Sequence, residues 1–278
     1  MNSHPYTGKT VAIATKHLKE KIVAPVFERL GIKVVVSNID TDLLGTFSGE
    51  IPRVGTPKEV VLNKARLGIT ESALQYGLAS EGSIGPDSSM PFVISDVECM
   101  AWIDTVLNLE ILEFYRSFEI VASHITVTKK DSLTNFLKKA DFPNHSLIAK
   151  SENGSGQIFK GLDTFERLET AINEISKESE KLIIESDLRA NHSPSRRKNI
   201  STVAEKLVNR LTFLCPKCHS PGWGEVGYLY GLTCLECKNF EERAVSGKIL
   251  GCAGCDFKEE RLGEKRFIAP AECSICNP

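Results

Sequence analysis

Residues 215–276 read CPKCHSPGWGEVGYLYGLTCLECKNFEERAVSGKILGCAGCDFKEERLGEKRFIAPAECSIC, and they contain eight of the nine cysteines in this 278-residue chain. The eight cysteines form four Cys-x-x-Cys pairs: Cys215 and Cys218, Cys234 and Cys237, Cys252 and Cys255, Cys273 and Cys276. Two intervening residues let both sulfurs of a pair turn toward one ion, and two pairs complete a tetrahedral site. The segment therefore predicts a double zinc ribbon with two structural Zn²⁺ ions, although a single iron per site fits the same geometry.

The spacing of the pairs leaves two ways of building the sites. Fifteen residues separate Cys218 from Cys234, and seventeen separate Cys255 from Cys273. Both intervals are typical of Cys₄ zinc sites. Sequential pairing joins the first two pairs and then the last two, whereas interleaved pairing joins the first with the third and the second with the fourth. We expect sequential pairing, because shorter loops close at a lower entropic cost.

The charge of this segment argues against a nucleic-acid reader. Residues 215–278 carry eight basic and nine acidic side chains, a sum of −1, and each Zn²⁺ held by four thiolates adds a formal −2. Phosphate binding depends on an excess of positive charge. We therefore expect the ribbon to be structural or to dock a protein partner, and not to bind nucleic acid.

The rest of the chain predicts an α/β domain. Residues 10–15 (TVAIAT) form an apolar run, residues 19–30 have helical spacing, and residues 33–39 (KVVVSNI) are β-branched. Two further strand-like runs, residues 77–86 and 91–104, predict a hairpin. The expected fold class is α/β: a mixed sheet with flanking helices over residues 1–212, followed by the cysteine-rich ribbon over 213–278.

The ends and the composition of the chain indicate a cytoplasmic protein with no membrane partner. The first residues lack the charged-then-apolar order of a signal peptide. No apolar run approaches the ~18–20 residues that span a bilayer. The formal net charge is −2, so the composition requires neither a nucleic acid nor an anionic membrane as partner.

Glu81 is the first candidate functional residue. It ends the apolar part of GLASEGSIGP (residues 77–86) and has serine and glycine neighbours. Small neighbours let a ligand or metal approach the backbone closely. The alternative is an acid on an edge strand that faces water.

The second candidate lies at a helix start, in ESDLRANHSPSRRKNI (residues 185–200). Ser193 is the expected N-cap and Pro194 the first helical residue. Arg196 and Arg197 then place positive charge where the helix dipole disfavours it. An anion bound by the helix N–H groups and these arginines would remove the conflict, with Arg189 and His192 close enough in sequence to join. The alternative is a solvated basic turn.

Two resemblances follow from these motifs. The pattern from ESDLRANHSP through CPKCHSPGWG to CSICNP resembles a bacterial family described as a domain of unknown function, along the whole chain. Residues 9–125 are also similar, more distantly, to the inosine/xanthosine triphosphate pyrophosphatases. The matching positions are Ala14-Thr15-Lys16-His17 with Lys19, Glu59 ahead of Lys64-Ala65 with Glu50 as a competitor, Ala79-Ser80-Glu81-Gly82-Ser83, and His192 with Arg196 and Arg197.

The resemblance implies a Mg²⁺-dependent hydrolase of a nucleoside triphosphate or related phosphate ester. The phosphates would be bound by Thr15, Lys16 and Lys19. Glu59 and Glu81 would hold Mg²⁺ and orient water for in-line attack. Arg189, Arg196 and Arg197 would neutralise developing charge, in one cleft shared with Glu81. The alternative is a non-catalytic adaptor that senses a nucleotide and docks a protein through the ribbon, and it becomes the better hypothesis if Glu81 and the arginines lie on opposite faces.

Overall fold

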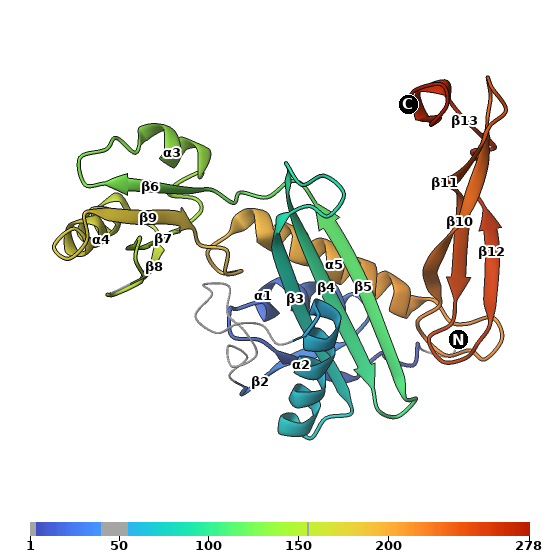
Figure 1. The fold of residues 1–278 in the computed structure, drawn as a ribbon. Helices are drawn as coiled ribbons and strands as arrows, with labels where there is room; N and C mark the ends of the chain where they lie inside the picture. Colours follow the sequence, from blue (N-terminus) through green and yellow to red (C-terminus); the bar gives the residue numbers. More distant parts are fainter. Residues whose placement is uncertain (1–3, 40–54, 155) are drawn as a thin grey trace.

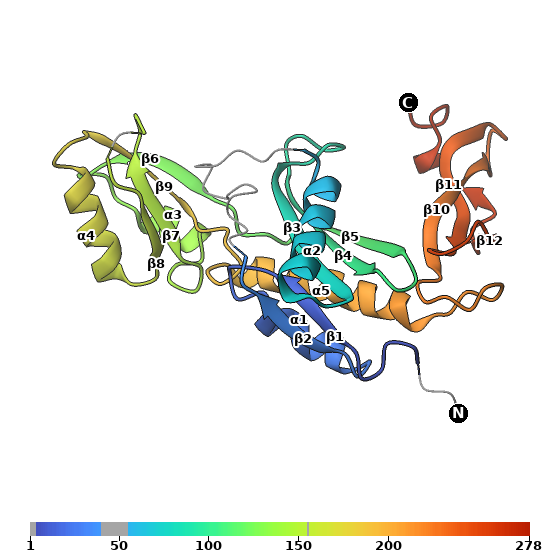
Figure 2. The same ribbon diagram turned by 90° about the horizontal axis from the view of Figure 1, so that it is seen from below.

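The computed structural model describes residues 4–39, 55–154 and 156–278 and contains three separate β-sheets (Figures 1 and 2). A five-stranded sheet has the order β2-β1-β3-β4-β5, a four-stranded sheet the order β6-β9-β7-β8, and the cysteine-rich sheet the order β12-β11-β10-β13. The expected class, a mixed α/β fold followed by a cysteine-rich module, is confirmed.

The five-stranded sheet is the centre of the molecule. Its strands are β1 (Thr10–Ala14), β2 (Lys33–Ser37), β3 (Tyr76–Pro86), β4 (Ile94–Asp104) and β5 (Leu109–Ser117). Strand β1 pairs in parallel with both β2 and β3, whereas β3, β4 and β5 form an antiparallel meander. Both the opening strand–helix–strand unit and the hairpin were predicted from the sequence.

Helices cover both faces of this sheet. One face carries α1 (Glu20–Glu28) and α5 (Pro194–Thr212), and the opposite face carries α2 (Pro57–Ser72). Because β1 lies between two helical layers, it is buried on both sides and reads as a continuous apolar run. We call this sheet with its three helices the core.

A second unit is inserted between β5 and α5. It consists of β6 (His124–Thr128), α3 (Thr134–Lys139), β7 (Leu147–Ser151), β8 (Phe159–Leu162), α4 (Phe165–Ile175) and β9 (Lys181–Ser186). Its antiparallel strands bury a hydrophobic cluster of their own, separate from that of the core. We call residues 124–186 the lobe; the predicted domain 1–212 thus contains two sheets and three hydrophobic clusters, two in the core and one in the lobe.

The C-terminal module follows α5 directly. It is built from β10 (Gly224–Cys234), β11 (Phe240–Gly251), β12 (Lys258–Leu262), β13 (Phe267–Ile268) and a 3-10 turn over Pro270–Glu272. Strands β10 and β11 form a long antiparallel hairpin that extends away from the core (Figure 1). Among the helices of the described residues, none has the length and apolar character that crossing a membrane requires.

Candidate metal centres and a buried polar site

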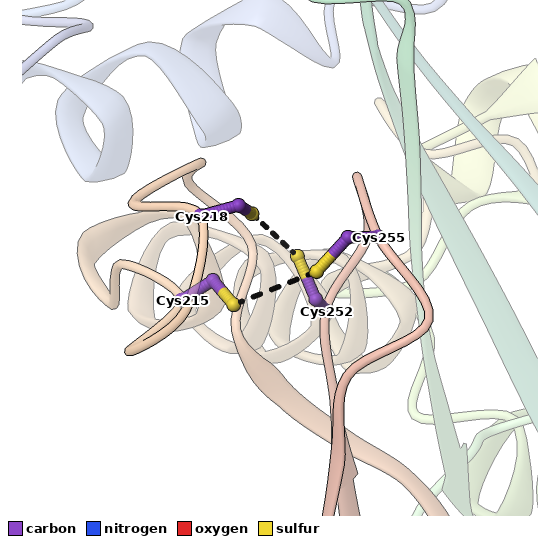
Figure 3. A group of neighbouring side chains, drawn as sticks. All are labelled: Cys215, Cys218, Cys252 and Cys255. Atoms are coloured by element: carbon purple, nitrogen blue, oxygen red, sulfur yellow. Dashed lines mark hydrogen bonds between the residues drawn. The ribbon is translucent and has the colours of Figure 1, made fainter.

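The eight ribbon cysteines gather into two groups of four. Cys215, Cys218, Cys252 and Cys255 form one group, which Figure 3 shows with its sulfurs converging, and Cys234, Cys237, Cys273 and Cys276 form the other. The contacting sulfur pairs are 3.5 and 3.9 Å apart in each group. A tetrahedral site with metal–sulfur bonds of ~2.3 Å has edges of about 3.8 Å. The chain therefore places two sets of four thiols where each could hold one metal ion.

The pairing is interleaved, so the expectation of sequential pairing was wrong. Strand β10 runs without a turn between the first and second cysteine pairs, and its eleven residues separate them by roughly 30 Å. Because β11 returns antiparallel, Gly224 lies opposite Gly251 and brings the first pair to the third. Sequential pairing would have the lower loop-closure entropy only if the residues between the pairs were flexible. Here they form a rigid hairpin, so this entropic advantage of sequential pairing is lost.

The backbone turns at the Cys-x-x-Cys pairs are those expected where both cysteines of a pair bind one metal ion. His219 and Lys238, the residues that follow Cys218 and Cys237, have positive φ values of 61° and 63°, which turn the chain sharply after each knuckle. The backbone N–H of Gly254 donates to Cys252 Sγ at 3.2 Å. Four thiolates leave no open position for substrate, so these donor sets suit a structural metal.

A second concentration of unusual residues lies in the core, where β1 ends. Strand β1 pairs with β3 only as far as Ala79, so among the described residues the following part of β3 has no strand neighbour on that side. Lys19 fills this place, and its Nζ donates to the carbonyl oxygen of Ser80 at 3.0 Å and to its hydroxyl at 2.9 Å. Burial, followed by the charge of Arg196, lowers the pKa of Lys19 to about 8. In doubly wound sheets of the order 2-1-3, ligands bind at this β1/β3 switch point.

Two buried ion pairs flank Lys19 on opposite faces of the sheet. On the α2 face, Lys64 Nζ lies 2.6 Å from Glu81 Oε2. On the α5 face, Arg196 Nε lies 2.6 Å from Glu98 Oε1, and both side chains are 0% exposed. Both pairs lie within electrostatic reach of Lys19. Buried pairs are weak evidence for stability alone and often mark functional sites.

The α5 face also carries Asp96, whose Oδ2 accepts a hydrogen bond from Asn199 Nδ2 at 2.8 Å. Burial, followed by the charge of Glu98, raises the pKa of Asp96 to about 7. Within the described ranges, Asp96 Oδ1, Glu98 Oε2 and Thr15 Oγ1 are buried and have no hydrogen-bond partner. Such atoms are rare in native proteins, and each requires an explanation such as a ligand or water.

A model of the family described as a domain of unknown function, DUF6671, matches residues 64–278. The chain belongs to this family. Its match includes the Lys64–Glu81 pair, the lobe and all eight ribbon cysteines. Neither a curated protein nor a solved structure matches the chain.

Three of the residues expected to bind phosphate in this DUF6671 member lie on the segment that leads from β1 to α1. Thr15, Lys16 and Lys19 all follow the end of β1. Thr15 and Lys16 line an open hollow of about 590 Å³, whose other walls are Leu18, Glu20 and residues 36–39.

The two candidate carboxylates have different surroundings. Glu81 is buried and paired with Lys64. Glu59 is exposed and forms the capping box of α2, where its Oε2 accepts from Thr56 N at 2.8 Å and Thr56 Oγ1 at 2.9 Å. These hydrogen bonds lower the pKa of Glu59. Its competitor Glu50 lies outside the described residues.

The arginines do not share one cleft with Glu81. Glu81 lies opposite Cys99, whereas Glu98, the partner of Arg196, lies opposite Gly82, so the two carboxylates project from opposite faces of the β3–β4 hairpin. Arg197 is exposed, and its NH1 donates to the carbonyl of Asn191.

Arg189 lies at the lobe, bound to Asp187, with Nε donating to Oδ1 at 2.9 Å. Its ion pair with Asp187 joins two residues of the segment that follows β9. The expectation of one anion gripped by Glu81-bound Mg²⁺ and all three arginines does not match this arrangement.

The N–H groups at the start of α5 also have partners other than the expected anion. Ser193 caps α5, and Pro194 opens it, as predicted. However, the N–H of Arg196 donates to Ser193 Oγ, and the N–H of Ser195 donates to His145 Nε2 at 3.1 Å. The N–H groups expected to bind an anion thus have protein partners, one of them from the lobe.

Sequence reasoning missed Lys64, Asp96 and Glu98 as members of the buried site. A signal was present for two of them, because Asp96 and Glu98 occupy alternate positions of the apolar strand ISDVECMAWID. Alternate residues of a strand share one face, so this pattern indicates two acids on a buried surface. Lys64 carries a weaker signal, as a charge among the buried residues of α2.

Proposed function

We propose that the core binds the phosphate group of a nucleotide or related phosphate ester at the carboxyl ends of β1 and β3. The observation that carries this proposal is Lys19, a buried cation held against the open edge of β3 at the switch point. Thr15 contributes a buried hydroxyl whose oxygen has no partner among the described residues. The resemblance of residues 9–125 to the inosine/xanthosine triphosphate pyrophosphatases supports the same location.

The charges of the site favour an anion as the ligand. Burial makes the protonated form of Lys19 costly, as its lowered pKa reflects. A phosphate beside Lys19 Nζ would restore that pKa, since an opposite charge within a few ångströms favours the charged form. The hollow beside Thr15 and Lys16 gives room for a phosphate and the group it is attached to.

The remainder of the ligand would extend toward the lobe. A cavity of about 210 Å³ lies between Ile84 and Ile94 of the core and Ile148 and Glu185 of the lobe. The Leu188 segment lines this cavity, and its carbonyl oxygen accepts from Arg196 NH1 at 2.7 Å. The lining combines aliphatic side chains with polar ones such as His124 and Asp187, which suits a flat group with hydrogen-bonding edges such as a nucleobase.

Mg²⁺-dependent hydrolysis is the second candidate, and the Lys64–Glu81 pair favours it. Lys64 fixes the Glu81 carboxylate within electrostatic reach of Lys19. A Mg²⁺ ion delivered with the substrate phosphates would supply charge neutralisation and a polarised water. In this scheme Glu81 would hold the ion and orient the water, while Lys19 and Thr15 would hold the phosphate. If the site binds a nucleotide without hydrolysing it, the chain acts as the non-catalytic adaptor. The separation of Glu81 from the arginines favours this alternative.

The test of binding compares two lysines that are two residues apart. Thermal unfolding of the wild type, Lys19→Met and Lys21→Met is measured with a panel of nucleoside mono-, di- and triphosphates, with and without Mg²⁺. Lys21 is exposed and serves as the matched control. A ligand at 100 times its Kd stabilises the fold by about 2.7 kcal/mol, so wild type and Lys21→Met should shift and Lys19→Met should not. Equal shifts in all three chains would refute the site.

The pH dependence gives an independent readout of the same site. The pKa of Lys19 is near 8 in the free protein, so affinity for inorganic phosphate or a nucleotide should fall as pH rises above 8. Binding near pH 8–9 should therefore be accompanied by proton uptake, measured by calorimetry in two buffers of different ionisation enthalpy. Release of phosphate or pyrophosphate that disappears in Glu81→Gln while binding persists would establish the hydrolase, and binding without release would establish the adaptor.

For the ribbon we propose two structural zinc ions and a protein-docking role. The four-thiolate donor sets support zinc. Elemental analysis of the purified chain should find close to two zinc per chain, and visible colour from iron would contradict this assignment.

A further inference from the structure

The tip of the β3–β4 hairpin, residues 87–94, carries a run of exposed apolar residues. Residues 90–94 read MPFVI, and all five are exposed, Phe92 completely. Isolated apolar side chains are common on protein surfaces. A consecutive run of them lowers solubility and is retained where it has a function. The run therefore identifies the tip as a surface that binds another molecule.

The tip is held in one conformation by hydrogen bonds. Asp87 is buried, and its Oδ1 accepts from the backbone N–H of Ser89 at 2.9 Å and of Met90 at 3.1 Å. From β5, Arg116 NH1 donates to both carboxylate oxygens of Asp87, at 3.2 and 3.1 Å. The N–H of Asp87 donates to the carbonyl of Val93 at 2.8 Å. The apolar residues are therefore presented by a preorganised loop, which lowers the entropic cost of binding.

The same hairpin forms one wall of the cavity between core and lobe. Ile84 and Gly85 of β3 and Ile94 of β4 line this cavity of about 210 Å³. Ile84 lies opposite Asp96, and Asp96 and Ile94 alternate along β4, so Ile84 and Ile94 project from the same face of the hairpin. Phe92 precedes Ile94 by two residues. The exposed ring is thus attached to the chain directly beyond this wall.

The cavity by itself is small for a whole ligand. Pockets for small molecules usually enclose about 300–1,000 Å³ and bury most of the ligand surface, whereas this one encloses about 210 Å³. A base bound against Ile84 and Ile94 would keep one face in water unless a further apolar surface covered it. The ring of Phe92 is such a surface, and it belongs to an element that already lines the cavity.

The size of the exposed surface favours a flat ring over a protein as its occupant. A phenylalanine side chain offers ~150–250 Å², and the side chains of Met90, Val93 and Ile94 are each more than half covered. A stable protein interface covers about 800 Å² on each partner. The tip falls well short of that area, whereas one phenylalanine ring matches the face of one nucleobase.

We propose that Phe92 stacks on the base of the nucleotide held between core and lobe, and so supplies the wall that the cavity lacks. This inference rests on the proposed function, in which the phosphate of the same ligand binds at Lys19. The ring turns about its side-chain bonds while the contacts of Asp87 with Arg116 keep the backbone in place. Every base has a π-face, so the contact tolerates different bases, and the larger purines gain more from it than the pyrimidines.

Calorimetric titration of the full chain in the presence of Mg²⁺ separates the base from the phosphates. The probes are ATP, GTP and inorganic tripolyphosphate, which has the phosphate chain without a base. Loss of base stacking lowers affinity roughly 5- to 150-fold, so Phe92→Ala should weaken ATP and GTP at least about fivefold and leave tripolyphosphate unchanged. Lys19→Met should weaken all three probes.

Phe165→Ala is the matched control for these titrations. Phe165 is also an exposed phenylalanine, but it lies on α4. This helix packs on the face of the lobe sheet opposite to the one that lines the cavity. Phe165→Ala should therefore bind all three probes like the wild type.

A tryptophan at the tip reports the contact directly. Phe92→Trp keeps a ring that can stack, and the two native tryptophans, Trp102 and Trp223, are buried. Acrylamide quenching therefore distinguishes the introduced ring from the native ones. Saturating ATP or GTP should change its emission and lower its accessibility to acrylamide several-fold, whereas tripolyphosphate should do neither.

The outcomes separate this inference from the site on which it rests. If ATP and GTP bind through Lys19 but equally well in Phe92→Ala, or leave the emission of Phe92→Trp unchanged, stacking is refuted and the phosphate site stands. If none of the probes binds, both are refuted. Equal losses for tripolyphosphate and the nucleotides in Phe92→Ala would contradict a contact with the base. Self-association of the wild type that Phe92→Ala abolishes would show that a second copy covers the tip, and would also overturn stacking.

Discussion

Replacing Cys237 by serine should release only the outer end of the ribbon, whereas replacing Cys218 should detach the ribbon from the core. The two residues end corresponding Cys-x-x-Cys pairs, and both are exposed. They differ in what surrounds their sites. The site of Cys237 lies at the end of the β10–β11 hairpin that is distant from the core (Figures 1 and 2). The site of Cys218 adjoins the core.

Contacts between core and ribbon concentrate at this inner site. Ala253, within the third cysteine pair, packs on the hydrophobic cluster of the core. Arg210 Nε donates to the carbonyl of Gly222 at 3.2 Å. The backbone at Gly222 approaches Ile111 so closely that a Cβ there would lie 2.5 Å from the Ile111 side chain. Loss of the inner metal should therefore also expose apolar surface of the core.

Loss of a metal should cost the ribbon much of its folding free energy, because few other interactions stabilise this module. Its hydrophobic cluster has four buried members, Leu232, Cys234, Ile268 and Cys273, and two of these are cysteines of the proposed outer metal site. Burial of the two aliphatic side chains contributes about 3–6 kcal/mol. Ordering each residue costs about 1–2 kcal/mol, so a handful of residues cancels that gain. A structural zinc supplies roughly 10–16 kcal/mol, so a site that no longer holds its ion cannot keep its end of the ribbon folded.

Zinc content and limited proteolysis measure both variants. Cys237→Ser should retain about one zinc per chain, become sensitive to protease after residue 234, and leave thermal unfolding of the core unchanged. Cys218→Ser should become sensitive from residue 215 onward and lower the melting temperature of the core. The reasoning fails if Cys237→Ser retains both metals, or if the region around residues 215–230 stays protected in Cys218→Ser.

Three further outcomes follow from the buried charges and from the ribbon. Arg196→Met should destabilise the chain by about 3–5 kcal/mol, because Glu98 is left buried and unpaired, whereas Arg197→Met at the exposed neighbour should change stability by less than about 0.5 kcal/mol in urea unfolding. Asp96→Asn should stabilise the chain at pH 8 more than at pH 5. Because the pKa of Asp96 is raised to about 7, the folded state keeps the proton up to about pH 7, whereas the unfolded state loses it near pH 4. The free energy of unfolding of the wild type therefore falls as pH rises from about 4 through 7, and the amide, which does not titrate, removes that fall. Fluorescence anisotropy at low salt should show no sub-micromolar binding of the chain to short DNA or RNA, given the acidic ribbon.

Local signals in the sequence predicted much of the fold. The strand–helix–strand opening, the β3–β4 hairpin and the capped start of α5 depend on neighbours within a few residues, and all are present. The eight cysteines were identified for the same reason. Their pairing was not, because it depends on whether the fifteen residues after Cys218 turn back or extend. They extend as β10, in which Tyr228 and Tyr230 alternate with smaller residues, and this strand pattern outweighs the entropy of loop closure.

The site was predicted less well, because its decisive contacts join distant parts of the chain. The sequence shows that Arg196 opposes the dipole of α5, but it does not show which group compensates the charge. The compensating group is Glu98, ninety-eight residues earlier, and the anion expected at the helix start is replaced by His145 from the lobe. The sequence therefore identified the unusual residues, but only the structure showed which residues they contact.

The charges around Lys19 also decide which ligand can arrive first. Lys19, Lys64 and Arg196 face two paired carboxylates, Glu81 and Glu98, so these five buried groups carry an excess of one positive charge. Asp96 offsets only part of this excess near neutral pH, because its pKa is about 7. A divalent cation alone would add repulsion, whereas a phosphate would remove it. Mg²⁺ should therefore bind here only together with an anionic ligand, so an ion that bound to Glu81 in the absence of phosphate would contradict the phosphate site and the hydrolase alike.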